Sequence, residues 1–157
     1  MVALCSGNIL LAARNRNEAD YARHLQVARS ELMAPLSAAS MEVGSYQRGY
    51  QYIVRLHMLT ELQHGMRTLF DLDARLDTSS DVTACDVNQL PAAQREQLLR
   101  QWKKRLQYTQ SSFKTQEPIL NLRRSMLSLA AEEQQRGMAA EEEIGHCWLS
   151  TARIARQ

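Results

Sequence analysis

The stretch SYQRGYQYIVRLHMLTELQHGMRTLF, residues 45–70, decides the fold class of this chain. Its apolar side chains recur every three or four residues, which is the period of an α-helix. One broad apolar side contains Tyr52, Leu56, Leu59, Leu62, Met66, Leu69 and Phe70, and a second contains Tyr46, Tyr50 and Ile53. The remaining polar seam is thin and lies near Gln47, Val54 and Glu61. A helix that is apolar nearly all round is normally an inner one, so residues 45–70 are expected to form the central element.

Two further helices are predicted before this stretch. Residues 9–13 have the pattern of the last turns of a helix, and Asn17 is a suitable N-cap for the next one. That second helix has a buried stripe at four-then-three spacing, made of Tyr21, Leu25, Ala28 and Leu32. Pro35 disfavours helical angles at the residue before it, so the helix is expected to stop or bend there. Residues 36–44 then read as a connector with at most one helical turn.

After residue 70 the composition changes, and three more helices follow. Residues 71–90 are rich in Asp, Ser and Thr and are predicted to form a mobile acidic loop. A helix is expected from Pro91 to about Ser112 and another from 115–118 to a stop at Gly137. Their buried faces are predicted to contain Leu98, Leu99, Trp102, Leu106 and Phe113, and then Ile119, Leu122, Met126, Leu129 and Ala130, with Leu120 and Leu127 widening the second.

A last helix is expected to begin at residues 141–143. Its shared face is predicted to contain Ile144, Trp148, Thr151 and Ala155, with Cys147 as a small core residue. About six helices without a strand indicate an all-α chain, either an α-solenoid of antiparallel hairpins or an irregular bundle. Both ends fall within helical patterns, so residues 1–157 are expected to be a piece of a longer repeat array.

Composition excludes several function classes. The formal net charge of the 157 residues is +2, which is too small for a nucleic-acid-binding footprint. No apolar run approaches the roughly 18 residues that a membrane-spanning helix needs. Three widely spaced cysteines indicate a reducing compartment rather than a disulfide framework. Direct nucleic-acid binding and membrane insertion are therefore not expected, and the cytosol or nucleus remains.

No catalytic, cofactor-binding or metal-binding residue is predicted. His57, Glu61 and His64 lie at i, i+4 and i+7 on one helical face, but nothing nearby in the sequence completes a metal site. Their more ordinary interpretation is two helix histidines beside the polar seam. The run 103–105 (Lys-Lys-Arg) sweeps around a helix and reads as a solvated face. No Gly-rich phosphate loop or kinase catalytic loop is present.

Four side chains are predicted to have structural roles: Arg55, Arg123, Trp102 and Trp148. Arg55 and Arg123 each fall inside an apolar helix face, and a guanidinium cannot lose its proton to escape burial. Each must therefore find carboxylate or carbonyl partners, or extend to water. At least one is expected to be buried and bonded to a neighbouring helix, fixing the register between hairpins.

Three blocks in order carry a family resemblance: PLSAASMEVGSYQRGYQYIVRLHMLTEL (residues 35–62), EPILNLRRSMLSL (117–129) and CWLSTARIAR (147–156). They resemble the FAT region of the checkpoint kinases in the phosphatidylinositol-3-kinase-related kinase family. The resemblance runs from about Leu11 to the end and is poor between Asp71 and Arg105. It implies tetratricopeptide-like and HEAT-like helical hairpins that wrap and support a kinase domain.

The same resemblance implies a nuclear serine/threonine kinase that responds to replication stress, with an obligate interacting partner protein. Residues for ATP, magnesium and phosphotransfer would lie in the kinase domain, beyond Gln157, so none is carried over to this chain. A second hypothesis stays open from the residues themselves. The chain could be a free-standing helical-repeat adaptor that binds a protein partner through its concave face.

Overall fold

A computed structural model describes residues 2–41, 43–44, 46–70, 90–134 and 137–156. Six helices account for most of these residues: α1 (Val2–Arg14), α2 (Glu18–Ser40), α3 (Tyr46–Phe70), α4 (Leu90–Tyr108), α5 (Phe113–Gln134) and α6 (Gly137–Ala155). The described part of the chain contains no strand. The predicted all-α fold class is confirmed. None of the helices in the described ranges is long and apolar enough to cross a membrane.

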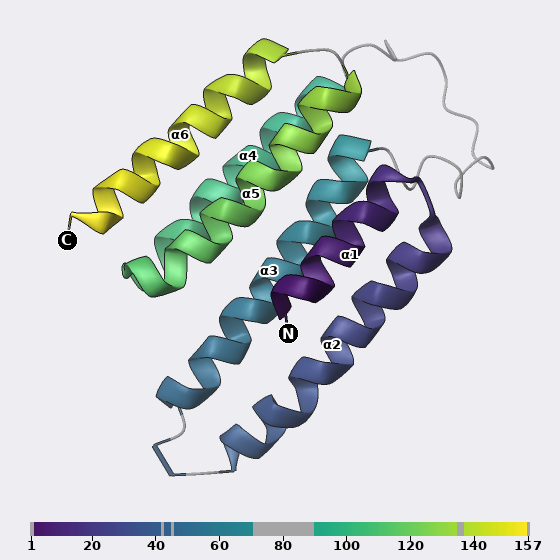
Figure 1. The fold of residues 1–157 in the computed structure, drawn as a ribbon. Helices are drawn as coiled ribbons and strands as arrows, with labels where there is room; N and C mark the ends of the chain where they lie inside the picture. The colour runs from purple at the N-terminus through teal and green to yellow at the C-terminus, as the bar shows by residue number, and fades with distance from the viewer. Residues whose placement is uncertain (1, 42, 45, 71–89, 135–136, 157) are drawn as a thin grey trace.

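The helices form a solenoid-like stack of hairpins in which α3 is the central element (Figure 1). Helix α3 contacts α1 and α2 on one side and α4 and α5 on the other, while α6 packs against α5. One continuous apolar core runs from Ile9 in α1 through Leu62 and Met66 in α3 to Met126 in α5. The central position predicted for residues 45–70 is therefore confirmed.

Helix α2 begins as predicted but ends later. The side chain of Asn17 accepts a hydrogen bond from the backbone N–H of Asp20 at 3.1 Å, as an N-cap does. Pro35 lies inside the helix, which continues to Ser40, so the predicted stop and the 36–44 connector are wrong. The reason is tertiary contact: Leu36 Cδ1 is 3.9 Å from the position that a Cβ on Gly49 would occupy. The last turn of α2 is thus held against α3.

Other boundaries also differ from the prediction, including the start of α5, which is Phe113. Helix α4 ends at Tyr108 rather than near Ser112, because Ser112 donates its backbone N–H to the Gln110 carbonyl in a tight turn. Gly137 is the first residue of α6 and not the stop of α5, so α6 begins four residues before Glu141. A glycine between two helices is compatible with either end, and the alanines that follow it favour extending α6. The predicted acidic loop lies outside the described residues, apart from Leu90, where α4 begins.

Candidate functional site: a buried arginine–glutamate centre

An ion pair between Arg123 of α5 and Glu61 of α3 lies in the interior of the molecule. Arg123 Nε donates to Glu61 Oε2 at 2.8 Å, and Arg123 Nη2 donates to Glu61 Oε1 at 2.6 Å. The side chains are 4% and 3% exposed, respectively. Two parallel charge-assisted hydrogen bonds of this kind are strong and fix the relative orientation of the two groups.

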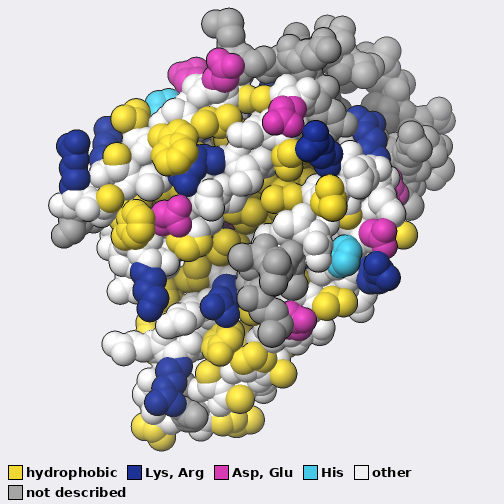
Figure 2. All heavy atoms as spheres, viewed as in Figure 1, with side chains coloured by type: hydrophobic (Ala, Val, Ile, Leu, Met, Phe, Trp, Pro, Cys, Tyr) yellow, Lys and Arg dark blue, Asp and Glu magenta, His cyan; other side chains and the backbone are white. Residues whose placement is uncertain are grey.

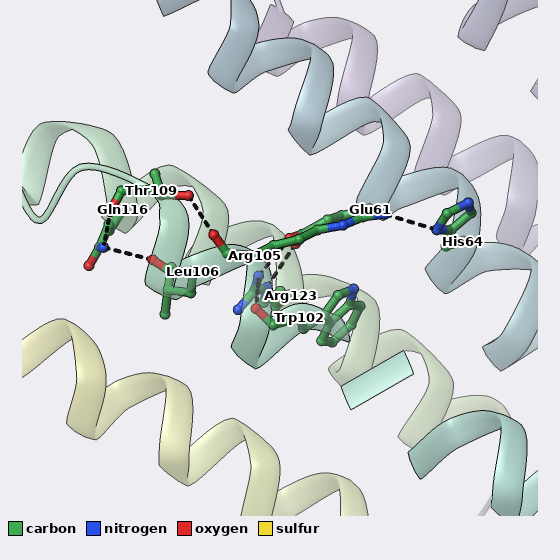
Figure 3. A network of polar contacts seen from close by, with 8 residues as sticks. All are labelled: Glu61, His64, Trp102, Arg105, Leu106, Thr109, Gln116 and Arg123. Carbon is green, nitrogen blue, oxygen red and sulfur yellow. Dashed lines mark hydrogen bonds and ion pairs between the residues drawn. The ribbon is translucent and has the colours of Figure 1, made fainter. Parts of the chain in front are cut away.

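Helix α4 completes this centre through Trp102. The Trp102 backbone carbonyl accepts a second bond from Arg123 Nη2 at 2.9 Å. The guanidinium carbon also lies 5.3 Å from the centroid of the Trp102 ring, within the range of a cation–π contact. One arginine therefore joins α3, α4 and α5, and Figure 3 shows the three side chains converging. We call Arg123, Glu61 and Trp102 the arginine centre.

Close approach of the three helices depends on Gly65, one turn after Glu61. A Cβ built on Gly65 would lie 2.7 Å from Met126 Sδ and 3.3 Å from Trp102 Cζ2. The side of α3 that contains Glu61 and Gly65 is thus covered by α4 and α5. The polar seam predicted near Gln47, Val54 and Glu61 is wrong at two of its positions, because Val54 is 9% and Glu61 only 2% exposed, while Gln47 is exposed.

Neighbouring contacts argue against a metal site at His57, Glu61 and His64. Both carboxylate oxygens of Glu61 are engaged by Arg123. His64 Nδ1 lies 3.4 Å from Arg105 Nη2, while His57 is exposed. Within the described ranges, no three His, Cys, Asp or Glu side chains are placed to hold a metal ion.

The electrostatic surroundings of His64 favour its neutral form. The pKa of His64 is lowered below its ordinary value of 6.5. The largest cause is partial burial, and the positive charges of Arg105 and Arg67 act in the same direction, while the negative charge of Glu61 raises the pKa. A neutral imidazole can accept a hydrogen bond from the Arg105 guanidinium. This contact adds a second polar link between α3 and α4, on the side of α3 that also holds Glu61 (Figure 3).

Polar contacts also fix the turn between α4 and α5. Gln116, buried in the first turn of α5, donates from Nε2 to the carbonyls of Leu106 at 3.3 Å and Thr109 at 3.1 Å. The Leu106 carbonyl, in the last turn of α4, also accepts the Thr109 N–H at 3.2 Å, and Thr109 is the first residue after the helix. The Gln110 N–H donates to the Tyr50 hydroxyl at 2.7 Å, which ties the turn to α3. The geometry holds helices in register.

Arg124 forms a second centre that the sequence analysis missed. Its Nη1 donates to Thr151 Oγ1 of α6 at 2.8 Å, and its guanidinium carbon lies 4.0 Å from the centroid of the Trp148 ring. Its Nη2 lies 3.3 Å from Glu117 Oε1. A signal was available, because Leu120 and Leu127 flank Arg124 one turn away on each side. Glu61 had a signal too, since it is the only acidic residue of α3.

The four predicted structural side chains fall into two groups. Arg123 and Trp102 are both 3% exposed, so the expectation that at least one arginine is buried and bonded across helices is confirmed. Arg55 is exposed and lies 5.8 Å from the Tyr52 ring centroid, outside the core. Trp148 shares a face of α6 with Thr151, since both contact Arg124, but its side chain is 58% exposed.

The most buried residues of α6 lie beside the predicted shared face. Cys147 and Ile154, at 8% and 9% exposure, pack against Leu120 of α5, while Ala155 is exposed. The predicted core position of Cys147 is confirmed, and burial raises the pKa of its thiol. One residue of offset turns a helix face by about 100°, which accounts for the exposure of Trp148. The basic run also lies as predicted, with Lys103 and Lys104 exposed.

Comparison with known proteins gives the class of this fold. The model of the FAT domain family matches residues 6–157, and the chain belongs to that family. The chain is 32% identical over 151 residues to the serine/threonine-protein kinase ATR of Arabidopsis thaliana, a match that covers 94% of this chain and 5% of that kinase. It is 32% identical over 148 residues to the ATR kinases of Oryza sativa subsp. indica and subsp. japonica, with the same coverage. No solved structure matches.

The chain thus spans about 5% of the length of the curated relatives that it matches. The resemblance stated from the three sequence blocks is confirmed, as FAT-domain similarity to ATR-type serine/threonine kinases. The helical-hairpin solenoid expected from that resemblance is confirmed as well.

Proposed function

We propose that this chain is a non-catalytic scaffold segment of an ATR-like serine/threonine protein kinase, acting in DNA-damage and replication-stress checkpoint signalling in the nucleus. The arginine centre is the observation that carries the proposal. It is a buried ion pair that joins three helices, and losing one partner of such a pair is strongly destabilising, so it supports a role in holding these helices together. Membership of the FAT family supports the same role.

The partners follow from this role. The segment would contact the kinase domain and the neighbouring helical repeats of its parent chain, and it would contribute to an assembly with the ATR-interacting protein. ATP and magnesium would be bound by the kinase domain, and this segment would need no cofactor of its own. We expect the isolated 157 residues to transfer no phosphate to a Ser/Thr-Gln peptide. Phosphorylation of that peptide by the purified chain, dependent on ATP, would contradict the proposal.

The scaffold role is tested in the parent kinase. Arg123→Ala leaves Glu61 buried without its partner, so the register of α3, α4 and α5 should be lost and phosphorylation of a Ser/Thr-Gln peptide should fall. The double variant Arg123→Met with Glu61→Leu removes both charges and should recover most of the activity. Arg153→Ala, at an exposed position of α6, is the matched control. Full activity of Arg123→Ala would refute a scaffold role for this centre.

The adaptor hypothesis predicts a different protein in the cell. An antibody raised against residues 93–132 should detect a species the size of a complete kinase if the segment is a scaffold. It should detect a species of about 157 residues if the chain is a free-standing helical-repeat adaptor. That measurement separates the two without relying on any variant.

A further inference from the structure

A groove of about 930 Å³ lies between the first half of α3 and the beginning of α5. Its lining includes Tyr46, Tyr50, Val54 and Met58 of α3, with Tyr108 and Lys114 on the facing side. Figure 2 shows this face of the molecule. Hydrophobic surface lies between the upper and lower parts of the molecule in this view, and Lys and Arg side chains lie around it. The arginine centre does not line the groove, so the groove is separate from that centre.

One wall of the groove is a regular ridge of α3. Tyr46, Tyr50, Val54 and Met58 follow one another at four-residue spacing, the row that packs between the side chains of another helix. Twelve residues of helix span about 18 Å, or roughly three turns. The Tyr46 and Tyr50 rings are in contact, with centroids 5.7 Å apart. The Tyr50 hydroxyl also accepts the Gln110 N–H, so the wall is held in place.

The opposite wall comes from the α4–α5 turn and the first turns of α5. Tyr108 stands at its edge and is 80% exposed, and Tyr46 on the facing wall is 73% exposed. Pro118 and Thr115 form the part of this wall nearest α5. Two large aromatic side chains are thus left in water on either side of a groove about as long as a three-turn helix.

The described charged side chains that line the groove are all positive. Its described lining contains two cationic side chains, Arg55 and Lys114, and no Asp or Glu. Three tyrosines, two cations and several amides and hydroxyls resemble an exchangeable interface between proteins, in which Tyr and Arg are enriched. A surface covered permanently would be more apolar. The composition therefore favours a partner that binds and leaves.

We infer that this groove docks an acidic amphipathic helix of a separate partner protein. The apolar side of that helix lies over Val54 and Met58, between the two exposed tyrosines. Its carboxylates meet Arg55 on one wall and Lys114 on the other. Helix-in-groove recognition of this type uses anchors at i, i+3, i+4 and i+7, about two turns of the bound helix, so the groove is long enough. The inference does not depend on the scaffold function.

The test uses three synthetic helical peptides of about 18 residues, roughly five turns, with identical leucine positions. One peptide has glutamates at its polar positions, the second glutamines and the third lysines. Binding of each fluorescently labelled peptide to the 157-residue chain is measured by polarisation at low and high salt. The acidic peptide should bind at least about tenfold more tightly than the basic one, and salt should weaken its binding.

Charge-reversal variants test whether the acidic peptide binds in the groove. Arg55→Glu with Lys114→Glu should weaken the acidic peptide about tenfold and strengthen the basic one. Arg100→Glu, on exposed α4 surface outside the groove, should change neither by more than about twofold. Tyr46→Ala with Tyr108→Ala removes exposed rings that the fold does not need, and it should weaken the acidic and neutral peptides alike. Circular dichroism of each variant establishes that the helices are retained.

Several outcomes would overturn the inference. The inference is wrong if the three peptides bind equally or if the acidic peptide does not bind. It is also wrong if Arg55→Glu with Lys114→Glu leaves the affinity for the acidic peptide unchanged. Self-association of the chain that is abolished by the double reversal would identify a second copy as the occupant. Displacement of the acidic peptide by a single-stranded oligonucleotide would assign the groove to a phosphate backbone.

Discussion

Arg123 and Arg124 are neighbours in the sequence, but they stabilise two different contacts in two different environments. Arg123 points into the contact between α3, α4 and α5, where it and its carboxylate partner are 4% and 3% exposed. Arg124 points towards α6, where it is 9% exposed and Glu117 is 29% exposed. Its other partners are the neutral oxygens of Thr151 and Asn121.

The difference shows that the stability lost when a buried arginine is replaced depends on which partner groups remain without it. Removing Arg123 leaves the Glu61 carboxylate buried without its charged partner. Removing Arg124 leaves Glu117, which water already reaches, and neutral groups whose loss of a partner is less costly. The two arginines therefore give a comparison between an enclosed centre and an edge contact on the same helix.

The largest effect is expected from Arg123→Ala. The free energy of unfolding should fall by about 3–5 kcal/mol, because a buried carboxylate loses both of its charged hydrogen bonds. Urea denaturation followed by circular dichroism measures the change.

The double variant Arg123→Met with Glu61→Leu is the control for this mechanism. Well-packed apolar residues often replace a buried ion pair without loss, so the double variant should be more stable than Arg123→Ala alone. If it is less stable than the single variant, shape and not the stranded charge accounts for the effect.

Gly65→Ala tests how closely the helices meet at the enclosed centre. The added methyl group would overlap Met126 Sδ, which is fully buried, so a loss of about 1–3 kcal/mol is expected. Gly145→Ala in α6 is the matched control, because nothing lies within 4 Å of its Cβ position. That change should raise stability by about 0.5–1 kcal/mol through helix propensity. Equal effects at both glycines would contradict the close contact.

Arg124→Ala is expected to have a smaller effect than Arg123→Ala, a loss of about 1–2 kcal/mol from its hydrogen bonds and its contact with Trp148. Trp148→Ala should reproduce part of this loss, and the effects of the two substitutions should not add because the side chains are in contact. Thermal denaturation of the two single variants and the double variant measures the coupling. A loss as large as that of Arg123→Ala would remove the distinction between centre and edge.

The smallest effect is a pH dependence at His64. Since its pKa is lowered in the folded chain, the unfolded chain binds the proton more tightly. The stability contribution is therefore complete above pH 6.5 and is lost as the pH falls below 6.5 through the lowered pKa. His64→Gln should flatten this part of the pH profile of unfolding. A profile unchanged by the substitution would show that His64 does not titrate differently in the two states.

Local periodicity was enough to predict much of the fold. The stripe of Tyr21, Leu25, Ala28 and Leu32 is buried as predicted, since four-then-three spacing places side chains on one face whatever covers it. The central place of α3 also followed from its sequence, because a helix that is apolar nearly all round must be covered on several sides. Arg123 was recognisable as a charged residue inside the apolar stripe of α5.

Boundaries and facing directions needed the tertiary structure. A proline or glycine gives a local preference of a few kcal/mol at most, and packing outweighed it at Pro35, where the end of α2 lies against Gly49. The exposure of Trp148 has the same type of cause, because α6 meets α5 through Cys147 and Ile154 instead. Sequence periods give the faces of a helix but not which face meets a neighbour.

By itself, the sequence determined an all-α chain, its central helix, its main apolar stripes, its resemblance to FAT domains and the burial of one arginine. Only the tertiary structure decided that the partner of Arg123 is Glu61, 62 residues away in the chain. That pairing depends on α3 turning its single acidic residue towards α5 while Gly65 lets the helices approach. The physical reason is that a buried charge requires a partner, but the chain contains 17 acidic residues, and only the packing of helices distant in sequence selects one of them.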